Sequence, residues 1–585
     1  MEDRRNIIIA VLLIGIILFG WPYITGHFFP NNEAASAPVA TTDEAAPPAN
    51  PDVVVPTSAA GQRNLQTALS DGPRIQVDTP KLDGSISLTG ARIDDMMLKK
   101  YRVGLAKDSP EVRLLAPPGT KDAYFSRFGW LGEGIELPND KTVWQASGPR
   151  LTPETPVTLS WRNGTGQIFQ LALSIDDNYL ITVDQKVANQ GGGPVAVRPY
   201  GLISRRGGSP DKSTWTIHVG PMGVFDGAAD YDWNYDDVED AGPKGAQFET
   251  TGGWLGFTDK YWLTALVPDQ KSPIDAAFRA SGDVYQDEML RKTPSVIQPG
   301  KQITQRSYFF VGAKETDVLD AYQDKLGFEK FSLAIDWGWF RPIEKMFLYI
   351  LTWLYDLTGN FGVAIICLTL IVRGLMFPIA QKQFKSMAQM KAIQPKMKKL
   401  QEKHKEDKQK QQQELMKLYK EEKVNPLAGC LPMFLQIPVF FALYKLLMLS
   451  IEMRHQPFAL WIQDLSAPDP LTPVNLFGLL PFDPPGMLHI GLLPILLGVT
   501  MFFQFRMQPM TDPVQKQMFS IMPWVMMVFM APFAAGLQLY WVASNLFTIA
   551  QQRLLYARHP ELKEQMKRDA EEKQREREAK AKASN

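Results

Sequence analysis

The sequence predicts an α-helical membrane bundle joined to a large all-β, sandwich-like domain. Five apolar runs of about 17 to 20 residues follow residue 360, and runs of that length span a bilayer. A sixth apolar run opens the chain. The long region between them alternates apolar and polar residues with period two, which is typical of half-buried strands. We therefore expect six transmembrane helices, five of them forming a core in the second half.

The sequence shows no catalytic signature, which disfavours an ATPase or a metalloprotease. Lys+Arg and Asp+Glu both number 62 in the 585 residues, so net charge points to no class of partner. The six histidines have no metal-ligand spacing, and no G-x-S-x-G, H-E-x-x-H, C-x-x-C or Walker motif occurs. We expect no catalytic residue, no metal and no cofactor. The two cysteines, Cys367 and Cys430, lie in or beside apolar runs, so the middle region would be held by its own core.

Residues 1–25 allow two interpretations. Two arginines precede an apolar run from Ile7 to Tyr23, and an A-S-A cleavage pattern stands at 35–37. A cleaved signal peptide is one interpretation and an uncleaved signal-anchor helix is the other. The run is long enough to span, and the A-S-A pattern lies well beyond its end, which favours the anchor. Residues 26–72 are rich in Pro, Ala, Ser and Thr and predict a disordered linker.

Residues 73–330 predict the β-sandwich domain. The stretch PVTLSWRNGTGQIFQLALSI indicates two strands around a turn at Asn163–Gly166. Asn163 also begins an N-G-T glycosylation sequon, but a hairpin turn explains the same residues better. The stretches NYLITVDQKVANQ and KQITQRSYFFVGA alternate in the same way, and a short helical run, KETDVLDAYQDKLGFEKF, follows them.

Residues 331–359 predict an amphipathic helix in the membrane interface just before the first core span. One helical face carries apolar side chains at Ile343, Met346, Phe347, Ile350, Leu354 and Leu357. The alternative is an amphipathic helix buried against the β domain.

Residues 360–556 contain the five core spans, which we expect at Phe361–Ala380, Cys430–Leu449, Leu488–Phe505, Phe519–Ala535 and Leu537–Leu555. A lysine-dense segment, 381–425, separates the first two. Its helical pattern breaks at Pro395 and Asp407, which predicts a two-helix hairpin. Residues 557–585 form a charged tail.

The distribution of lysine and arginine predicts the orientation. Cytoplasmic loops are enriched in these residues, which places the hairpin, the 506–516 loop and both termini in the cytoplasm. Residues 453–505 contain a single lysine or arginine, Arg454. The β domain and the 454–489 loop are therefore expected on the opposite, periplasmic side.

Arg373 lies within the first core span, after the uncharged run FGVAIICLTL. An arginine in a membrane helix costs several kcal/mol unless it reaches water. It could snorkel to the cytoplasmic headgroups, or it could face a water-filled cavity. No Asp or Glu within a span could pair with it. Other polar side chains within the spans favour the cavity: Gln436, Gln504, Gln538, Ser544 and Asn545.

Four long motifs resemble the YidC family of bacterial membrane protein insertases, in the Gram-negative form with a large periplasmic domain. They are VRGLMFP at 372–378, KVNPLAGCLPMFLQIPVFFALYKLL at 423–447, PFALWIQDLSAPDP at 457–470 and GLQLYWVASNLFTIAQQ at 536–552. The order of the segments and the β domain match as well, so the resemblance covers nearly the whole chain.

The resemblance implies that Arg373 lies in a hydrophilic groove that opens to the cytoplasm and to lipid and binds incoming chains. Thr369, Gln436, Tyr540 and Trp541 stand at motif positions that line this groove in the family. The family often has tyrosine where Trp541 stands, so only an aromatic ring is kept there. We add Gln504 from its chemistry alone.

The resemblance also implies location and partners. It places the chain in the bacterial inner membrane as a multi-pass protein that inserts and helps to fold other membrane proteins, alone or beside the Sec translocon. Nascent membrane proteins, lipid, the Sec translocon and the ribosome are the implied partners, with no specific nucleic acid recognition. One outer-loop stretch departs from the family, LTPVNLFGLLPFDPPGMLHI at 471–490, and we assign it no role.

Two other functions remain open from the residues themselves. Polar side chains inside a bundle would also suit a solute or ion transporter. Alternatively, the chain could be a membrane scaffold whose β domain anchors outer complexes. A scaffold would depend on the β domain and tolerate changes at Arg373, whereas an insertase would show the reverse.

Overall fold

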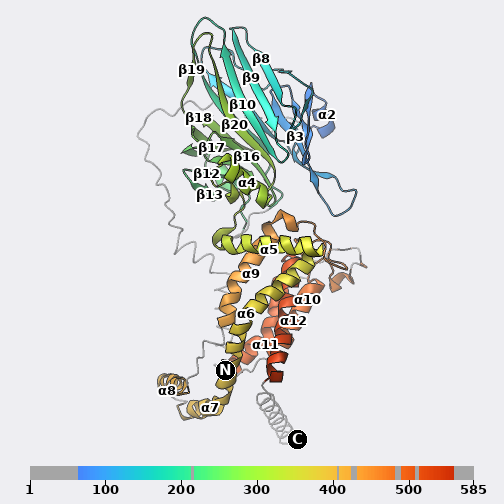
Figure 1. Cartoon of the computed structure of the whole chain (residues 1–585), viewed down its shortest axis with the longest axis vertical. Helices are drawn as coiled ribbons and strands as arrows, with labels where there is room; N and C mark the ends of the chain where they lie inside the picture. Colours follow the sequence, from blue (N-terminus) through green and yellow to red (C-terminus); the bar gives the residue numbers. More distant parts are fainter. Residues whose placement is uncertain are drawn as a thin grey trace. The chain divides into compact units, whose positions relative to one another are not determined.

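The computed structural model describes residues 63–211, 217–404, 407–422, 431–477, 479–480, 482, 489–507 and 513–558. The chain divides into two compact units (Figure 1). The first is the β domain, which ends at Asp336, and the second is the helical bundle, which begins at Trp337. The predicted anchor 1–25, most of the linker and nearly all of the charged tail lie outside the described residues.

The β domain is built from two sheets. The first has the strand order β14-β17-β18-β11-β5-β3-β2-β1-β7, with β19 paired to β11 and β4 paired to β3. Its strands are β1 (Arg74–Asp78), β2 (Leu82–Ser87), β3 (Arg92–Arg102), β4 (Glu111–Leu115), β5 (Tyr124–Gly132), β7 (Arg150–Leu151), β11 (Val195–Arg206), β14 (Ala246–Thr251), β17 (Pro273–Ser281), β18 (Val284–Arg291) and β19 (Ser295–Ile297). Its pairs are antiparallel except β1 with β7.

The second sheet is antiparallel, with the order β13-β12-β15-β16-β20-β10-β9-β8-β6. Its strands are β6 (Gln145–Ala146), β8 (Val157–Arg162), β9 (Gln167–Ile175), β10 (Leu180–Asn189), β12 (Gly220–Phe225), β13 (Ala228–Asp230), β15 (Trp254–Thr258), β16 (Trp262–Pro268) and β20 (Gln302–Ala313).

Aromatic side chains pack between the two sheets. The Trp130 ring of β5 lies 5.2 Å from the Phe169 ring of β9. The Phe128 ring of β5 likewise faces the Phe309 ring of β20, with centroids 6.5 Å apart. Because one partner of each pair comes from either sheet, the period-two faces predicted from the sequence meet in one core. The β-rich, sandwich-like domain is therefore confirmed.

The β8–β9 hairpin forms around the predicted turn. The Asn163 side-chain oxygen accepts the backbone N–H groups of Thr165, at 3.2 Å, and Gln167, at 2.8 Å. Gly166 has a φ of 94°, which favours glycine. Asn163 is buried, and its amide nitrogen donates to Gln167 Oε1 at 2.8 Å. The hydrogen bonds of Asn163 within the turn therefore explain why asparagine stands at this position.

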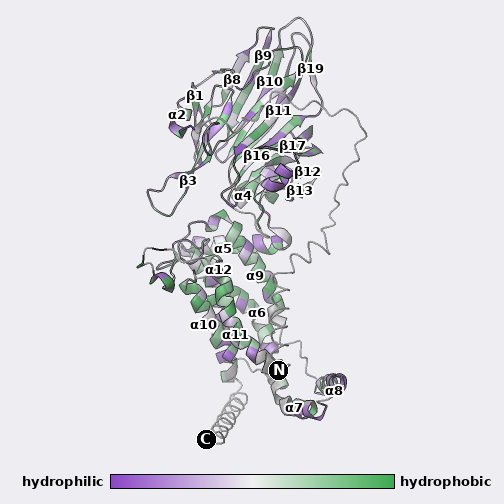
Figure 2. Cartoon of the chain, turned by 180° about the vertical axis from the view of Figure 1, so that it is seen from behind, coloured by the Kyte–Doolittle hydropathy of each residue, from purple (hydrophilic) through white to green (hydrophobic). Residues whose placement is uncertain are grey.

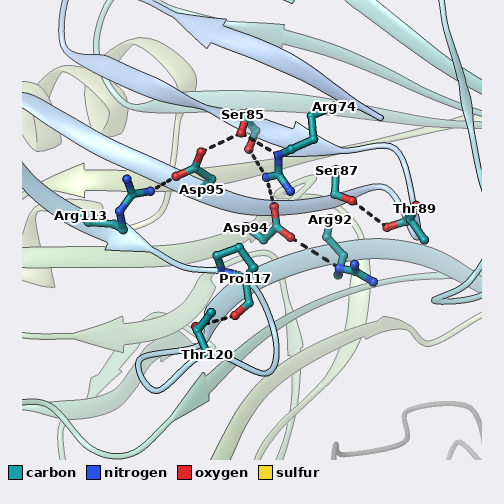
Figure 3. A network of polar contacts seen from close by, with 10 residues as sticks. All are labelled: Arg74, Ser85, Ser87, Thr89, Arg92, Asp94, Asp95, Arg113, Pro117 and Thr120. Carbon is teal, nitrogen blue, oxygen red and sulfur yellow. Dashed lines mark hydrogen bonds and ion pairs between the residues drawn. The ribbon is translucent and has the colours of Figure 1, made fainter. Parts of the chain in front are cut away.

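A register shift between β2 and β3 gathers charged side chains (Figure 3). Ser85 pairs with Asp95 and the next residue pairs with Ile93, so Asp94 is the extra residue of a bulge. The Arg74 guanidinium contacts both the Asp94 carboxylate and Ser85 Oγ, the latter at 2.8 Å. Ser85 Oγ in turn donates to Asp95 at 2.7 Å. The bulge is thus stabilised by paired charges in which both carboxylates have partners.

A second polar cluster lies deeper between the sheets. Arg205 Nη1 donates to Asp259 Oδ1 at 2.8 Å, and Lys314 Nζ donates to Thr258 Oγ1 at 2.9 Å. Asp287 is fully buried, and neither carboxylate oxygen has a hydrogen-bond partner among the described residues. Burial raises the pKa of Asp287 well above its usual value and lowers that of Lys314 to about 8.

Two helices complete the β domain. One is α3 (Tyr235–Asp240), and the other, α4 (Thr316–Leu326), ends at Gly327 in the left-handed conformation. The helix predicted after the last strand is thus confirmed. The short 3₁₀ turn Phe331–Ala334 adds Phe331, whose ring packs 5.2 Å from Trp254. The unit continues to Asp336, beyond the expected boundary at residue 330.

The second unit is a helical bundle. Its main helices are α5 (Arg341–Thr358), α6 (Phe361–Ala392), α9 (Leu431–Leu449), α10 (Leu492–Met507), α11 (Pro513–Met530) and α12 (Ala535–Arg558). α5 lies across one end of the bundle (Figure 1). α6 packs against α5 and α12, and α10 packs against α11 and α12. Figure 2 shows that apolar residues dominate the bundle helices, whereas α7 and α8 are hydrophilic.

By length and composition, one described helix could cross a membrane, over Phe361–Gln383. Phe434–Leu449, Leu492–Met507 and Gln517–Met530 are shorter apolar helices. One expected end was wrong. α11 ends at Met530 and not at about 535, because Pro532 disfavours helical geometry in the residue before it. The expected first core span, Phe361–Ala380, agrees closely with the apolar stretch Phe361–Gln383, and the α6 helix continues beyond it to Ala392.

The apolar side chains of α5 divide between buried and exposed positions. The buried residues are Glu344, Phe347, Leu348, Leu351 and Leu354. Of the face predicted to lie in the membrane interface, Leu357 is 71% exposed and Met346 is exposed as well, whereas Phe347 and Leu354 are buried. α5 carries apolar side chains on more than one face, so periodicity alone could not decide which of them contacts α6.

The lysine-rich segment forms two short helices. α7 (Gln394–Lys403) has Pro395 in its first turn, where a missing N–H costs no hydrogen bond. α8 (Lys408–Glu421) is capped by Asp407, which accepts the Lys410 N–H at 3.0 Å. Both predicted breaks are confirmed. Lys396 and Glu422 form an ion pair that joins the two helices.

Candidate functional site

Arg373 of α6 reaches across to α12. Its Nε donates to Ser544 Oγ at 2.9 Å, and its Nη2 contacts the same oxygen. The side chain is half-buried and forms no ion pair with any described residue. A guanidinium carries five N–H donors. One serine oxygen therefore leaves most of them available to acceptors from outside the bundle.

Gln436 of α9 adjoins this pair. Its Nε2 donates to Tyr540 Oη at 2.6 Å, while its Oε1 is buried with no partner among the described residues. Tyr540 is buried and lies one helical turn before Ser544 on α12. The two hydrogen-bonded pairs are thus neighbours on α12, and together they join α6, α9 and α12.

Trp541 contacts α9 through its ring. The ring lies 5.1 Å from that of Phe440, at an interplanar angle of 50°. Further along α9, Tyr444 contacts Phe533, with ring centroids 5.5 Å apart. α9 therefore meets the α11–α12 segment through long aromatic side chains, and at Trp541 the aromatic ring is the contacting group.

Two predicted site residues do not join this group. Thr369 is fully buried, and its hydroxyl donates to the Ile365 carbonyl of its own helix at 2.7 Å. It lies one turn before Arg373 but packs inward. Gln504 is on α10, and its Oε1 is buried without a partner among the described residues. Neither residue has a hydrogen bond to Arg373, Tyr540 or Gln436.

Ser544 is the functional candidate that the sequence did not single out. It was one of several polar residues in the spans, but nothing marked it as the acceptor for Arg373. Its spacing of four from Tyr540, which puts both on one helical face, was the available signal. Gln538 has a different role, because its Nε2 donates to the Met530 and Phe533 carbonyls, both at 2.8 Å, and closes the α11–α12 turn.

Asn545 faces another helix. Its Nδ2 donates to Thr500 Oγ1 of α10 at 3.1 Å. It therefore stabilises the α10–α12 contact and does not extend the Arg373 group.

The arrangement suits binding of polar groups. A cation among apolar helices prefers water, carboxylates or backbone carbonyls as partners. Arg373 of α6, Gln436 of α9 and Tyr540 of α12 supply hydrogen-bond donors and an acceptor close together. Among the described residues, no three His, Cys, Asp or Glu side chains are placed to hold a metal ion.

Two protein-family models match the chain. The model described as "YidC periplasmic domain" matches residues 74–350, and the one described as "60Kd inner membrane protein" matches 353–565. Their common border falls within α5.

Curated relatives match over almost the full length. The chain is 45% identical over 567 residues to the membrane protein insertase YidC of Zymomonas mobilis, covering 96% of each chain. It is 44% identical over 586 residues to the protein of that name from Beijerinckia indica, covering 95% of this chain and 96% of the relative. A solved structure, "Active YidC insertase crystal structure with the first transmembrane domain resolved", is 19% identical with a TM-score of 0.35, covering 83% of this chain and 95% of that one.

Proposed function

The chain belongs to the YidC family of membrane protein insertases, and on this premise we propose that it inserts proteins into the bacterial inner membrane through a hydrophilic groove between α6, α9 and α12. The family is non-enzymatic and carries a periplasmic domain beside an inner-membrane domain. The clients are nascent membrane proteins.

The proposed topology has six spans. α6, α9, α10, α11 and α12 form five of them, and the apolar run at the chain start is the sixth. Both termini and the α7–α8 hairpin lie in the cytoplasm, and the β domain lies in the periplasm. The lysine content of the hairpin supports this orientation.

The groove lowers the barrier for a polar segment that must cross hydrocarbon. Each unpaired polar group in lipid costs several kcal/mol, so a hydrated path that reaches partway across shortens the dry part. The polar segment of the client contacts Arg373, Gln436 and Tyr540 while its apolar helix moves into lipid. Burial of that helix in lipid supplies the driving force, and no nucleotide is needed.

One observation carries the proposal. Arg373 is half-buried in an apolar bundle, and Ser544 is its acceptor among the described residues. A structural arginine in such a place would be expected to have a carboxylate partner. An arginine that serves a passing polar segment must instead keep donors available.

The partners proposed beyond clients and lipid are the ribosome and the Sec translocon. The basic α7–α8 hairpin favours contact with an acidic surface such as a ribosome at the site of synthesis. Contact with the Sec translocon rests on the family resemblance.

The test is insertion by the purified protein in liposomes, without nucleotide or other protein. A small one- or two-span membrane protein is added, and protease protection of its outer segment is scored. We expect insertion above that of empty liposomes with the parent, loss with Arg373→Ala, and partial retention with Arg373→Lys, which keeps the charge.

Arg506→Ala is the matched control, because Arg506 lies at the exposed end of α10 over the Phe502 ring. It should insert as well as the parent. Equal insertion by the parent and Arg373→Ala would show that this arginine is not part of the working site. No insertion by the correctly folded parent would contradict an autonomous insertase.

A further inference from the structure

The loop between α9 and α10 exposes large apolar side chains at its tip. The loop is described over 450–477, 479–480, 482 and 489–491. Leu479 is 81% exposed, and Leu460, in an earlier turn of the same loop, is 83% exposed. The other exposed apolar side chains of the tip are Val474, Leu476, Phe477, Leu480 and Phe482. Water disfavours so many exposed apolar side chains in one short connection.

Backbone N–H groups of the described tip bond within the loop. The Leu476 N–H donates to the Pro473 carbonyl at 3.0 Å, and the Phe477 N–H to the Thr472 carbonyl at 2.9 Å. The N–H groups of Leu479, Leu480 and Phe482 also donate to carbonyls of the tip. Hydrocarbon offers no hydrogen bonds, so a segment that enters it must satisfy its own donors. These five N–H groups already have partners, through the 3₁₀ turn Pro473–Asn475 and the turns that follow it.

The exposure is held in place by the loop conformation. Leu460, Leu476 and Phe477 all have positive φ, at 57°, 51° and 59°. Bulky residues rarely adopt this left-handed region, because Cβ crowds the backbone. A loop in water would gain by leaving it and turning these side chains inward. A contact that the apolar side chains make outside the protein would compensate for the strain.

The loop is also fixed to the bundle. Asp469 is buried, and its carboxylate accepts Trp461 Nε1 at 2.9 Å and the Leu493 N–H at the start of α10 at 2.6 Å. Asn360, just before α6, donates through Nδ2 to the Phe458 carbonyl at 2.7 Å. These bonds place the loop at the end of the bundle where α6 and α10 begin, which is the end that α5 covers (Figure 1).

We propose that the tip of the α9–α10 loop inserts into the lipid leaflet at this end of the bundle and acts as an apolar wedge. The inference rests on the proposed function, because it assumes that the bundle spans a membrane. Lipid is the partner that the site favours, since α5, which covers this end of the bundle, also exposes apolar side chains, such as Trp353 at 56% and Leu357 at 71% exposure. It gives a role to the described residues between 471 and 482, which belong to the stretch that departs from the family pattern.

The test uses nitroxide labels on the full chain in liposomes of phosphatidylethanolamine and phosphatidylglycerol. Cys367→Ser and Cys430→Ser give the background, and single labels are placed through Leu479→Cys and Leu460→Cys. Collisions with oxygen, which concentrates in lipid, are compared with collisions with a water-soluble nickel complex. We expect an oxygen-to-nickel ratio severalfold above that of a label in water.

Two reference labels separate the outcomes. Leu375→Cys reports the lipid face of α6, and Ser281→Cys reports an exposed strand end of the β domain. Loop labels that behave like Leu375→Cys support the wedge. Loop labels that match Ser281→Cys overturn the wedge, because they lie in water. Loop labels that are shielded from both reagents also overturn it, because they indicate a protein partner. A water-like signal from Leu375→Cys would instead contradict the membrane-spanning bundle and with it the proposed function.

Discussion

Arg373, which is half-buried, and Asp287, which is fully buried, are both ionisable residues away from bulk water, but their surroundings differ in kind. Arg373 has a polar acceptor, Ser544, and neighbours that can hydrogen bond. Asp287 lies between two β-sheets, with neither oxygen bonded to a described residue. A guanidinium stays charged under all ordinary conditions, so it must be solvated, whereas a carboxyl group can lose its charge by taking up a proton. Arg373 therefore indicates a binding site, whereas Asp287 indicates a core residue that takes up a proton.

Asp287→Asn should change how the stability of the β domain depends on pH. Burial raises the pKa of Asp287, so the folded state keeps this proton at pH values where the unfolded state has lost it. Stability is retained at acid pH and falls as the pH rises through the folded pKa. The variant should be more stable than the parent at about pH 8, and the difference should shrink towards about pH 4.

Urea unfolding of the full chain, followed by the circular dichroism of the strands, measures this difference. Asp283→Asn is the control, because Asp283 is half-exposed and pairs with Arg206 at the surface. It should move the unfolding midpoint little. A parent and Asp287→Asn variant with parallel pH profiles would mean that Asp287 titrates normally in the fold.

Ser544→Ala tests the acceptor of Arg373 while leaving the charge in place. A hydrogen bond to a charged group contributes roughly 1.5–3 kcal/mol, and water can replace part of it. We expect insertion in the liposome assay to fall by roughly tenfold or less. Insertion should therefore be highest for the parent, lower for Ser544→Ala and lowest for Arg373→Ala. Ser520→Ala on α11, whose hydroxyl bonds to the Gln517 carbonyl of its own helix, should have no effect. Loss as deep as that of Arg373→Ala would mean that Ser544 itself binds the client.

At the scale of elements, α12 organises the bundle because successive faces meet different helices. Ser544 contacts α6, Tyr540 and Trp541 contact α9, and Asn545 contacts α10. The turn between α11 and α12 is also held by specific hydrogen bonds. Gln538, near the start of α12, bonds to the Met530 carbonyl at the end of α11, where the helix supplies no partner of its own, and to the Phe533 carbonyl in the turn.

Gln538→Ala should destabilise the α11–α12 turn. Two good hydrogen bonds to buried carbonyls are lost, and the carbonyls stay buried, so we expect a loss of roughly 1–3 kcal/mol. The melting temperature of the detergent-solubilised protein measures this. Gln517→Ala, at an exposed position of α11, provides the control. A variant that melts with the parent would show that water replaces the amide at the turn.

At the scale of the whole molecule, the division into two units predicts that they can be separated. The β domain contains its own two-sheet core and ends at Asp336, while the Arg373 group lies wholly within α6, α9 and α12. Deleting residues 73–336 removes the domain together with the 3₁₀ turn that packs on it. The shortened chain should still insert a small client in liposomes, and Arg373→Ala should abolish that insertion.

A shortened chain that is correctly folded in detergent but inactive would contradict this separation. It would favour the scaffold function, in which the β domain does the essential work. Circular dichroism of the bundle helices, compared with that of the full chain, distinguishes inactivity from misfolding.

The sequence by itself determined the class of protein, because the relevant signals are local. Period-two alternation, apolar runs, the N-G-T turn and the breaks at Pro395 and Asp407 depend on neighbours a few residues apart. The position of Arg373 in an uncharged run is local too, and it singled out the site. The motifs that matched a known family supplied Gln436, Tyr540 and Trp541.

Only the tertiary structure decided which side chains meet. Ser544 lies 171 residues from Arg373, and their contact depends on how far α6 and α12 are rotated about their axes. The same rotation turned Thr369 inward to its own helix and chose the packed face of α5 from several apolar ones. Sequence periodicity describes the faces that a helix offers, whereas packing against its neighbours selects the face that is used.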